Sequence, residues 1–534
     1  MRAADSVGFS LFKGGAPRRA APSVWLVALA GAAQALSLSW PWSMPELFSG
    51  ALWSRGDALW WLQLLALSLL VDRLQKAANA AQAASLGWVF GLSWLGCTFA
   101  WLYVSMHRFG GMPAPMAVAS VVALAAALSL YYALACAVFF QLQRRSNWLS
   151  VLVFAAVWTL AELGRGVVFT GFGWGATAYA HIDGPLAPWL AWVGVYGVGA
   201  MAAAAAVLLA GSPKALARSM RAGLAHLGLI VLLLGSGAGL PAPSGQSVGV
   251  LAVSLLQGNI GQGEKFDNGV GVPMSLDWYG AQLLANDSTL VITPETALPV
   301  LPAQLPKGYW QRLRERYASG HQAALIGMPM GSLDQGYSNS VVGLQPGEGL
   351  SWRYDKHHLV PFGEFIPPWF RWFTELMNIP LGNFQRGGLP QATFNWAGQR
   401  IATLVCFETL FSEELAAHFR SSSSGPTILA NVSNLAWFGE NLAMDQHLNI
   451  ARARALELSR PLLLASNTGV TAIVDHQGKV VQRAPSQQAF VLRGQVEGRS
   501  GLTPYARWLA AWGLWPLLAL ALLVLGASWV VARR

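Results

Sequence analysis

Three residues whose types together can transfer an acyl group occur in the order Glu295, Lys356 and Cys406. A cysteine attacks a carbonyl carbon as its thiolate, so a nearby group must remove the thiol proton. Glu295 can act as this general base. Lys356, together with a backbone N–H near Cys406, can stabilise the oxyanion that the attack creates. The three residues therefore predict acyl transfer through a cysteine thioester.

Two of the three residues directly follow predicted strands. The segment LVIT leads into Pro294 and Glu295, and the segment IATLV leads into Cys406. In open α/β sheets, reactive groups lie just beyond the carboxyl ends of the strands. Lys356 comes from the segment RYDKHHLVPFGEF. We therefore expect the three side chains to meet at one edge of a sheet.

Further polar residues lie close to this trio in the sequence. Glu364 follows Lys356 by eight residues, and Glu408 follows Cys406 by two. Both are predicted to orient Lys356 or an attacking amine. His357 and His358 are alternative bases, but adjacent histidines in a polar loop are expected to be solvated. No metal and no cofactor are expected.

The region 245–497 has the composition of a water-soluble domain, and short β-rich runs alternate with helical patterns along it. This alternation predicts an α/β layered domain. The expected strands are 250–257, 290–293, 323–327, 340–344, 401–405, 427–430, 462–466 and 471–474, and the expected helices are 274–287, 306–319, 411–420 and 443–459.

The cysteine count supports Cys406 as the nucleophile. The chain has three cysteines, too few for a disulfide framework. Cys97 and Cys136 fall within apolar segments and are expected to be small packing residues. Cys406 is the lone thiol of the water-soluble region, although on count alone a buried structural cysteine would be the simpler interpretation.

The rest of the chain has the composition of a membrane protein. Hydrophobic residues make up 54% of the 534 residues and charged residues 11%, whereas a soluble protein carries about 25% charged residues. Seven membrane spans are predicted within 24–241 and an eighth within 505–534, because about 20 apolar residues cross a bilayer as a helix. The predicted spans are 24–41, 58–71, 85–105, 115–142, 148–168, 187–211, 222–241 and 507–531.

The basic residues predict the orientation of these spans, since cytoplasmic loops are enriched in Lys and Arg. With eight spans, the basic loops all fall on one side of the membrane. Residues 1–23 and the C-terminal tail are then cytoplasmic, and the region 245–497 is periplasmic. The net charge is +10, and many of the basic residues lie in these short loops rather than on one soluble face, which disfavours nucleic-acid binding. The basic positions are Arg18, Arg19, Arg73, Lys76, Arg144, Arg145, Lys214, Arg218, Arg221, Arg533 and Arg534.

The apolar region contains one pair of charged residues and one cluster of glycines. Glu162 and Arg165 have helical i,i+3 spacing near the end of the fifth span. Charges at such depth are usually paired, so an ion pair within the bundle and a role in substrate binding both remain open. The glycines of GVYGVG, from Gly194 to Gly199, are expected to allow close helix packing.

The motifs resemble those of the apolipoprotein N-acyltransferase family, a branch of the nitrilase superfamily, over nearly the whole chain. TPETALP surrounds Glu295, RYDKHHLVPFGEFIP holds Lys356 and Glu364, and LVCFETLF holds Cys406 and Glu408. Similar segments are LLQGNIGQGEKFD, SNLAWFG, QHLNIARARALELSRPLLLASNTGVTAIVDHQG and, in the membrane region, ELGRGVVFTGFGWGATAY and GVYGVG. The resemblance implies a multi-pass α-helical membrane bundle with a nitrilase-like periplasmic domain, an αββα sandwich.

The resemblance also implies a reaction. Cys406 would take an acyl chain from a membrane phospholipid, with phosphatidylethanolamine as the expected donor. It would pass the chain to the α-amino group of a diacylglyceryl cysteine at the N-terminus of an apolipoprotein. A monomer is expected. The alternatives are a membrane-tethered amidohydrolase, a paralogous N-acyltransferase with another amine acceptor, and a transporter or non-catalytic scaffold.

The sequence departs from the family pattern at four positions, which are expected to affect substrate fit. Phe266 stands where Trp is expected, Phe407 where Tyr is common, Leu435 where Asp is usual and Leu464 where Arg is usual. Phe266, Phe407 and Trp437 are candidates for contact with substrate or for a lid. Apolar segments that could form a greasy entrance are Ile366–Leu381 and Leu435–Phe438.

Overall fold

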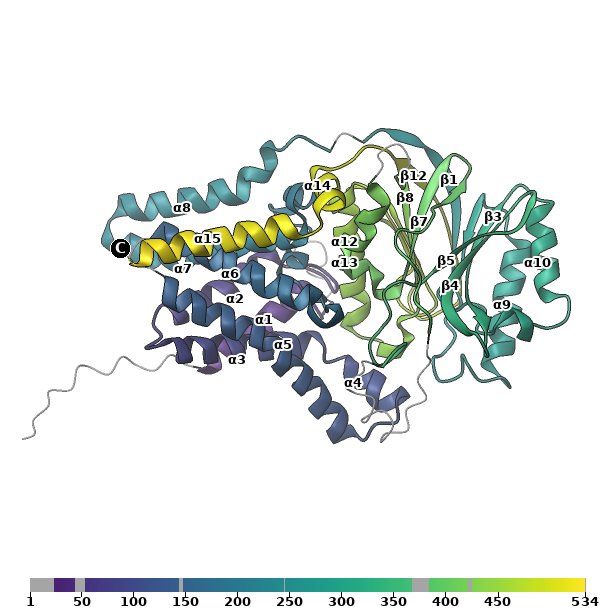
Figure 1. Ribbon diagram of the computed structural model, residues 1–534, viewed down its shortest axis with the longest axis horizontal. Helices are drawn as coiled ribbons and strands as arrows, with labels where there is room; N and C mark the ends of the chain where they lie inside the picture. Colours follow the sequence, from purple (N-terminus) through teal and green to yellow (C-terminus); the bar gives the residue numbers. More distant parts are fainter. Residues whose placement is uncertain are drawn as a thin grey trace, which may run out of the picture.

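The computed structural model describes residues 24–43, 53–143, 147–243, 245–366, 384–420 and 425–533. Its helices gather in a bundle at one end, and its two sheets stand side by side at the other (Figure 1). The predicted cytoplasmic segment 1–23 and most of the predicted entrance Ile366–Leu381 lie outside the described residues.

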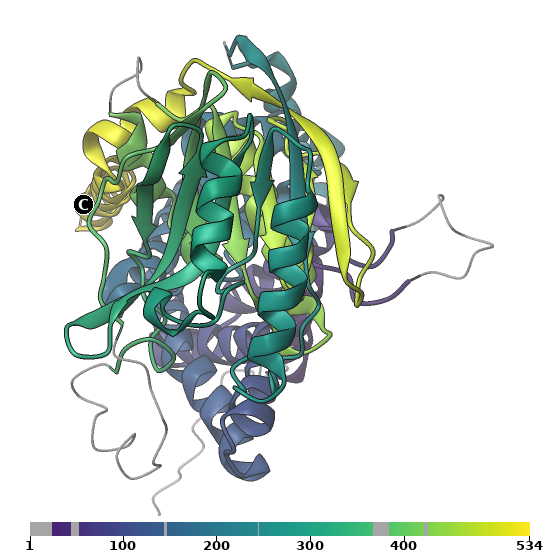
Figure 2. The ribbon, with the colours of Figure 1, turned by 90° about the vertical axis from the view of Figure 1, so that its right-hand side faces the viewer.

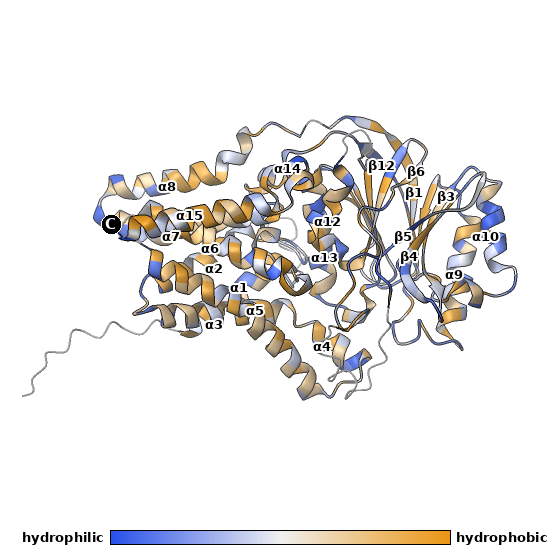
Figure 3. Cartoon of the chain, in the orientation of Figure 1, coloured by the Kyte–Doolittle hydropathy of each residue, from blue (hydrophilic) through white to orange (hydrophobic). Residues whose placement is uncertain are grey.

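The bundle contains a helix for each of the eight predicted apolar segments, and Figure 3 shows that these helices are largely hydrophobic. The segment predicted as 85–105 is broken: α3 is followed at a bend of 60° by α4 and a π-helical turn, Ser105–Phe109. The helices are α1 (Val24–Leu38), α2 (Trp60–Leu74), α3 (Ala80–Thr98), α4 (Leu102–Val104), α5 (Ala114–Leu142), α6 (Asn147–Val167), α7 (Leu190–Arg218), α8 (Met220–Gly235), α14 (Pro504–Trp512) and α15 (Trp515–Arg533).

Four of the helical segments in the described chain are long and apolar enough to cross a membrane, and six if each of two bent pairs counts as one span. One bent pair is α3 with α4 and its π-helical turn, and the other joins α14 to α15 at 87°. Helices α1 and α2 have 15 residues each, fewer than the ~20 that a span needs. The number of eight crossings therefore stays a prediction.

The α/β region consists of two six-stranded sheets. Every predicted strand is present, and β5, β6, β11 and β12 are additional. The first sheet has the order β12 (Phe490–Arg499), β1 (Ser247–Gln257), β2 (Leu290–Ile292), β3 (Ala323–Ser332), β4 (Gly336–Gln345), β5 (Glu348–Asp355), and the second has the order β11 (Val480–Arg483), β10 (Ala472–Val474), β9 (Leu462–Ser466), β8 (Ile428–Ser433), β7 (Gln399–Val405), β6 (Phe394–Trp396).

Helices cover the outer faces of both sheets, so the domain has four layers. Alternating apolar side chains of β1, such as Val253 and Leu255, meet those of β7 and β8 in a core between the sheets. Helices α9 (Gly271–Ala285) and α10 (Tyr309–Ala318) lie across the first sheet (Figure 2). Helices α12 (Ser412–Ala416) and α13 (Leu442–Leu458) cover the second sheet. This is the αββα arrangement that the resemblance to the family implies.

Helices α12 and α13 lie between the second sheet and the helix bundle (Figure 1). The apolar core of the bundle continues into this layer, because Phe407, Phe411 and Ile450 belong to the same cluster of buried side chains. Polar contacts join the two parts as well. The indole N–H groups of Trp101 and Trp174 both donate to Oε1 of Gln446 on α13, at 3.2 and 2.8 Å. The helix bundle thus packs directly against the layer behind the second sheet.

Of the two alternatives for Glu162 and Arg165, a direct ion pair between them is not what the structure shows. Oε1 of Glu162 accepts from the backbone N–H and the hydroxyl of Thr177, at 2.8 and 2.7 Å. Arg165 donates instead to the carbonyl oxygens of Phe172 and Trp174, both at 2.7 Å. The two charged side chains therefore hold one connecting segment, 172–177, against α6. This segment carries Trp174 to its contact with Gln446.

The glycines of GVYGVG do allow close packing. Gly194 interrupts α7 with a φ of 67°, and the ring of Tyr505 from α14 lies where a Cβ would be. At Gly199, an added Cβ would lie 2.8 Å from Oε2 of Glu162. Any larger residue at either position would collide with a buried side chain.

Candidate active site

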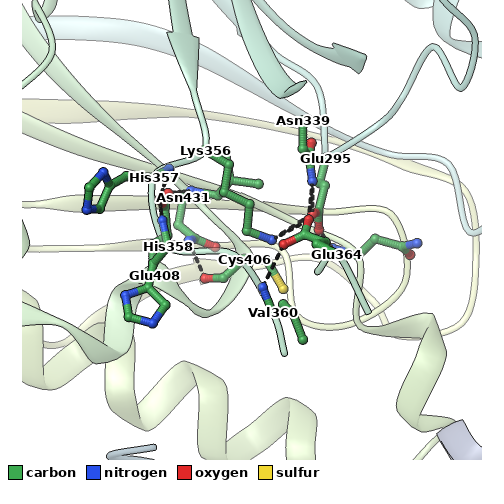
Figure 4. Close-up of polar contacts among 12 residues, drawn as sticks. Glu295, Asn339, Lys356, His357, His358, Val360, Glu364, Cys406, Glu408 and Asn431 are labelled. Carbon is green, nitrogen blue, oxygen red and sulfur yellow. Dashed lines mark hydrogen bonds and ion pairs between the residues drawn. The ribbon is translucent and has the colours of Figure 1, made fainter. Parts of the chain in front are cut away.

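The three predicted catalytic residues come from the ends of three strands. Glu295 follows β2, Lys356 follows β5 and Cys406 follows β7. Lys356 is 1% exposed and Glu295 8% exposed. Nζ of Lys356 lies 3.5 Å from Oε1 of Glu295, and Figure 4 shows the sulfur of Cys406 pointing toward the same group. The structure therefore brings together residues that are up to 111 positions apart in the sequence.

Lys356 lies between two carboxylates. Its Nζ donates to Oε1 of Glu364 at 2.9 Å, closer than its contact with Glu295. Nδ2 of Asn339 donates to both carboxylates, at 2.7 Å to Glu295 and 2.9 Å to Glu364. Oε2 of Glu295 accepts the backbone N–H of Asn434 at 3.1 Å. These contacts fix both carboxylates around the ammonium group (Figure 4).

Cys406 has a backbone conformation that few non-glycine residues adopt. Its φ is 56°, and such strain costs of order 1–3 kcal/mol and persists only where surrounding contacts impose it. Here three side chains hold its carbonyl oxygen: Asn431 Nδ2 at 2.8 Å, and His447 Nε2 and Thr409 Oγ1 at 3.3 Å each. The turn separates the thiol from the strand and directs it toward Lys356.

The environment of the thiol disfavours ionisation in the resting state. Burial is the largest cause that raises the pKa of Cys406, and the charges of Glu295 and Glu364 raise it further. Lys356 and a hydrogen bond from the backbone N–H of Phe407 lower this pKa. The pKa of the Lys356 ammonium is raised by its two carboxylates despite its burial. Because its pKa is raised, the Cys406 thiol needs a base that takes the thiol proton as the sulfur attacks.

The carboxylate of Glu408 accepts hydrogen bonds from backbone N–H groups rather than from the Lys356 side chain. Its Oε1 accepts the backbone N–H groups of His357 and His358 at 2.8 and 2.9 Å. Its Oε2 accepts the backbone N–H of Val405 at 2.6 Å and the hydroxyl of Tyr354 at 3.0 Å. One buried carboxylate thus ties the segment that carries Lys356 to the turn that carries Cys406. Burial raises the pKa of Glu408 to about 7.

The expectation that both adjacent histidines are solvated is wrong for His358. This residue is 5% exposed, its ring stacks on Phe411 at 3.6 Å, and its Nδ1 lies 2.7 Å from Glu414. His357 is half-buried, and its Nδ1 contacts the carbonyl of Gly387 at 2.7 Å. Each imidazole thus has a hydrogen-bond partner other than the Cys406 thiol.

The candidates for substrate contact occupy three different environments. Phe407 is 7% exposed, and its ring centroid is 5.6 Å from Nζ of Lys356. Trp437 is 40% exposed and packs edge-to-face against Phe109 of the bundle, with ring centroids 5.9 Å apart. Phe266 is 49% exposed and lines a cavity of about 710 Å³ between α9 and α10. Phe407 therefore lies at the catalytic group, and Trp437 lies where bundle and domain meet.

The departures at Leu435 and Leu464 belong to one apolar cluster. Leu435 is 1% exposed and Leu464 0% exposed, and both pack in the core between the second sheet and α13. Where the family pattern has an acidic and a basic residue, this chain has two leucines. With leucine at both positions, this core holds no charge that would need compensation there.

Sequence reasoning missed Asn339 and Asn434, the two asparagines that bind Glu295. Asn339 lies directly before the predicted strand 340–344, in the run YSNSVV. An amide side chain beside a buried strand needs hydrogen-bond partners. This requirement was the signal that the sequence offered for Asn339. Among the described residues, no group of three His, Cys, Asp or Glu side chains could hold a metal ion.

The comparison with known families first defines the class of the α/β domain. The family model described as Carbon-nitrogen hydrolase matches residues 255–504. The crystal structure of a carbon-nitrogen hydrolase from Helicobacter pylori G27 aligns with 51% of this chain and 95% of its own, at 15% identity and a TM-score of 0.35.

A second family model, described as Apolipoprotein N-acyltransferase N-terminal domain, matches residues 49–208. Proteins named apolipoprotein N-acyltransferase from Verminephrobacter eiseniae, Ralstonia nicotianae and Bordetella bronchiseptica are 48%, 43% and 39% identical to this chain. The matches cover 93%, 89% and 95% of this chain and 95%, 90% and 97% of the relatives. The chain belongs to the apolipoprotein N-acyltransferase family, and it is an acyltransferase with a carbon-nitrogen hydrolase domain.

Proposed function

We propose that this acyltransferase moves a fatty acyl chain from phosphatidylethanolamine, through a thioester on Cys406, to the α-amino group of a diacylglyceryl cysteine at the N-terminus of an apolipoprotein. The observation that carries the proposal is the Lys356 ammonium between Glu295 and Glu364, beside the thiol of Cys406. The names and coverage of the relatives support the choice of acceptor.

In the first half of the reaction, Glu295 takes the proton of the Cys406 thiol while the sulfur attacks the ester carbonyl carbon of the phospholipid. The Lys356 ammonium and a backbone N–H near the turn stabilise the oxyanion. The C–O bond to the glycerol then breaks. The leaving alkoxide takes the proton from Glu295, and a lysophospholipid departs.

In the second half, the amine of the acceptor attacks the thioester carbonyl carbon. Glu295 takes a proton from the amine nitrogen, the C–S bond breaks, and the thiolate of Cys406 leaves. The thiolate then recovers the proton held by Glu295. The product is an amide, and the enzyme returns to its starting state.

The position of the site suits substrates that are held in a membrane. The turn after Cys406 contributes Phe407, Leu410 and Phe411 to the apolar core that continues into the helix bundle. Phe438, beyond β8, packs on Trp101 of the bundle with ring centroids 4.3 Å apart. An acyl chain that leaves the bilayer beside these aromatic side chains would need little exposure to water.

The proposal includes the orientation in the membrane, with a periplasmic α/β domain and cytoplasmic termini, and a monomeric enzyme. Two of the predicted basic loops lie together, since Nζ of Lys214 donates to Oε1 of Gln75 at 2.6 Å. The C-terminus lies at the end of the bundle farthest from the sheets (Figure 1). Basic loops gathered at that end support its placement in the cytoplasm.

The test uses the purified full-length protein with vesicles of phosphatidylethanolamine. Mass spectrometry of the Cys406 peptide should show a mass increase of one fatty acyl chain. Addition of a diacylglyceryl lipopeptide with a free amine should remove this mass and produce an N-acylated lipopeptide. Release of free fatty acid with no acylated lipopeptide would instead identify a hydrolase.

Two variants test the assigned roles in the same assay. Cys406→Ala should form no acyl-enzyme, and Glu295→Gln should form it at least about 100-fold more slowly, since a positioned base contributes that much or more. Glu315→Gln is the matched control, because Glu315 is exposed on α10. Normal acylation of Cys406 in Glu295→Gln would show that Glu295 is not the base.

A further inference from the structure

A second buried lysine, Lys265, contacts the main chain of the proposed base, Glu295. Its side chain is 0% exposed, and its Nζ donates to the main-chain carbonyl oxygen of Glu295 at 3.0 Å. A fully buried ammonium group is rare in proteins and is costly unless charge and hydrogen bonds compensate it. The reaction steps described above make no use of this residue.

Lys265 lies in the connection between β1 and α9, and the backbone of this connection packs closely around it. The backbone N–H of Lys265 donates to the carbonyl of Gly261 at 3.0 Å. Gly271 permits the closure, since an added Cβ there would lie 2.8 Å from Cα of Lys265 and closer still to the carbonyl oxygen of Glu264. The Lys265 side chain is therefore held inside the domain by tight backbone packing.

The segment that carries Lys265 also contacts the carboxylate of Glu295 indirectly, through hydrogen bonds of Gln262 and Asn434. Oε1 of Gln262 accepts from Nδ2 of Asn434 at 2.7 Å, and the backbone N–H of Asn434 donates to Oε2 of Glu295 at 3.1 Å. Lys265 thus holds the main chain of Glu295, and Gln262 positions the residue that holds its carboxylate.

The buried charges of Glu295, Glu364 and Lys356 sum to zero only when the ammonium group of Lys265 is added. Glu295 and Glu364 supply two carboxylates, and Lys356 supplies one ammonium group. An uncompensated buried charge is strongly unfavourable. Among the described residues, Glu295 is the titratable group whose charge acts on Lys265. The second ammonium group brings the cluster to two positive and two negative charges.

We propose that Lys265 is a positioning residue that holds Glu295 in place and supplies the positive charge that offsets the carboxylate of Glu295 beside the Cys406 thiol. The inference rests on the proposed roles of Glu295 and Cys406. The charges that act on the Cys406 thiol come from Glu295, Glu364 and Lys356. Loss of Lys265 would remove the positive charge that interacts with Glu295. The two carboxylates beside the thiol would then be balanced by Lys356 alone, and the net negative charge opposes formation of a thiolate.

The pH range of the effect follows from the titration of Lys265. Burial lowers the pKa of Lys265 to about 7, against the opposing influence of Glu295. The positive charge is therefore present below about pH 7 and is lost above it. A variant without this charge should differ most from the wild type below that pH and should resemble it above.

The experiment measures alkylation of Cys406 by iodoacetamide at pH 6 and pH 9, read from the Cys406 peptide by mass spectrometry. The full-length protein in detergent is compared with Lys265→Met, Lys265→Gln and Lys265→Arg. The matched control is Lys307→Met, since Lys307 is exposed. At pH 6, Met and Gln at position 265 should slow alkylation about tenfold, as a neighbouring charge shifts a pKa by about one unit or more. At pH 9 the rates should converge with the wild type.

Lys265→Arg should react like the wild type at pH 6, because arginine keeps its charge. Lys265→Gln keeps a donor without the charge, so it separates the charge from the hydrogen bond even if Lys265→Met does not fold. Equal slowing at pH 6 and pH 9, or a normal rate in folded Lys265→Gln, would overturn the proposal. Iodoacetamide needs no lipid, so these outcomes are independent of whether phosphatidylethanolamine acylates the wild-type enzyme.

Discussion

Nδ2 of Asn339 donates to Oε1 of Glu295 at 2.7 Å, and the same amide donates to Oε1 of Glu364 at 2.9 Å. One side chain on β4 therefore connects the proposed base to the second carboxylate that holds Lys356. The amide has no charge, so it can bridge two negative groups without changing the balance of the cluster.

Replacement of this bridge should slow catalysis more than it affects folding. In Asn339→Leu the two carboxylates lose their shared donor, and we expect acylation of Cys406 to fall about 10- to 100-fold because charge-assisted hydrogen bonds of this kind contribute about 1.5–3 kcal/mol each. The rate is measured from the acylated Cys406 peptide. Asn395→Leu is the control, since Asn395 is exposed. An unchanged rate in folded Asn339→Leu would show that the bridge is dispensable.

Glu408 should make the stability of the enzyme depend on pH. Burial raises its pKa from 4.5 to about 7, so the folded protein binds this proton more tightly than the unfolded chain does. The stabilisation is complete below pH 4.5 and is lost as the pH rises through about 7, by an amount of about 3 kcal/mol.

The measurement compares thermal unfolding midpoints in detergent at pH 5 and pH 8. The wild type should lose more stability over this interval than Glu408→Gln, which has no proton to release. Glu408→Gln should also be less stable at both pH values, because its amide nitrogen cannot accept from the backbone donors. If the two proteins show the same pH dependence, Glu408 does not titrate in this interval.

Gln446 should couple the helix bundle to the α/β domain. Gln446→Leu leaves the indole N–H groups of Trp101 and Trp174 without their shared acceptor, and each unsatisfied buried donor costs about 1–3 kcal/mol. We expect a lower thermal midpoint and slower acylation, since the adjacent His447 contacts the carbonyl of Cys406. Gln311→Leu, at an exposed position of α10, should change neither quantity. Normal stability of Gln446→Leu would argue against this coupling.

The departures at Leu435 and Leu464 lie in one apolar cluster and predict non-additive effects. Leu435→Asp or Leu464→Arg alone would place an unpaired charge in an apolar core and should cost about 3–5 kcal/mol. The double variant should be more stable than the sum of the single effects, because opposite charges in one cluster can compensate. Thermal midpoints and membrane yields of all four proteins provide the comparison. Additive losses would show that the two positions are independent.

The proposed orientation can be tested by labelling in intact spheroplasts with a membrane-impermeant maleimide. Asp334→Cys, on the exposed connection between β3 and β4, should react without permeabilisation. Lys76→Cys, exposed after α2, is the matched probe for the opposite side and should react only after the membrane is opened. The reverse pattern would place the α/β domain in the cytoplasm.

Much of the fold follows from local patterns. The eight predicted strands and the four predicted helices of the α/β domain are present, because β-rich runs and helical periodicity alternate clearly along 245–497. The strands that were not predicted are short or carry polar residues on alternate positions. Strand β5, Glu348–Asp355, is the most important of them, because it carries Lys356 to the site.

The lengths of the membrane helices were less predictable. Hydropathy marks each apolar run but does not reveal the bend after α3 or the sharp turn between α14 and α15. Gly194 illustrates the limit: the space where a Cβ would lie is filled by the ring of Tyr505, from a segment more than 300 residues later. The sequence shows the glycine but does not show the ring that requires it.

The sequence by itself determined the chemical types at the site, Glu295, Lys356 and Cys406, and the strand ends that present two of them. These are local properties, since a residue's chemistry and the pattern around it can be read within a short window. Only the tertiary structure decided the partners: Asn339 between two carboxylates, Glu408 on the backbone of the Lys356 segment, and Lys265 behind Glu295. These contacts join residues distant in the chain, so they exist only once the two sheets have packed against each other.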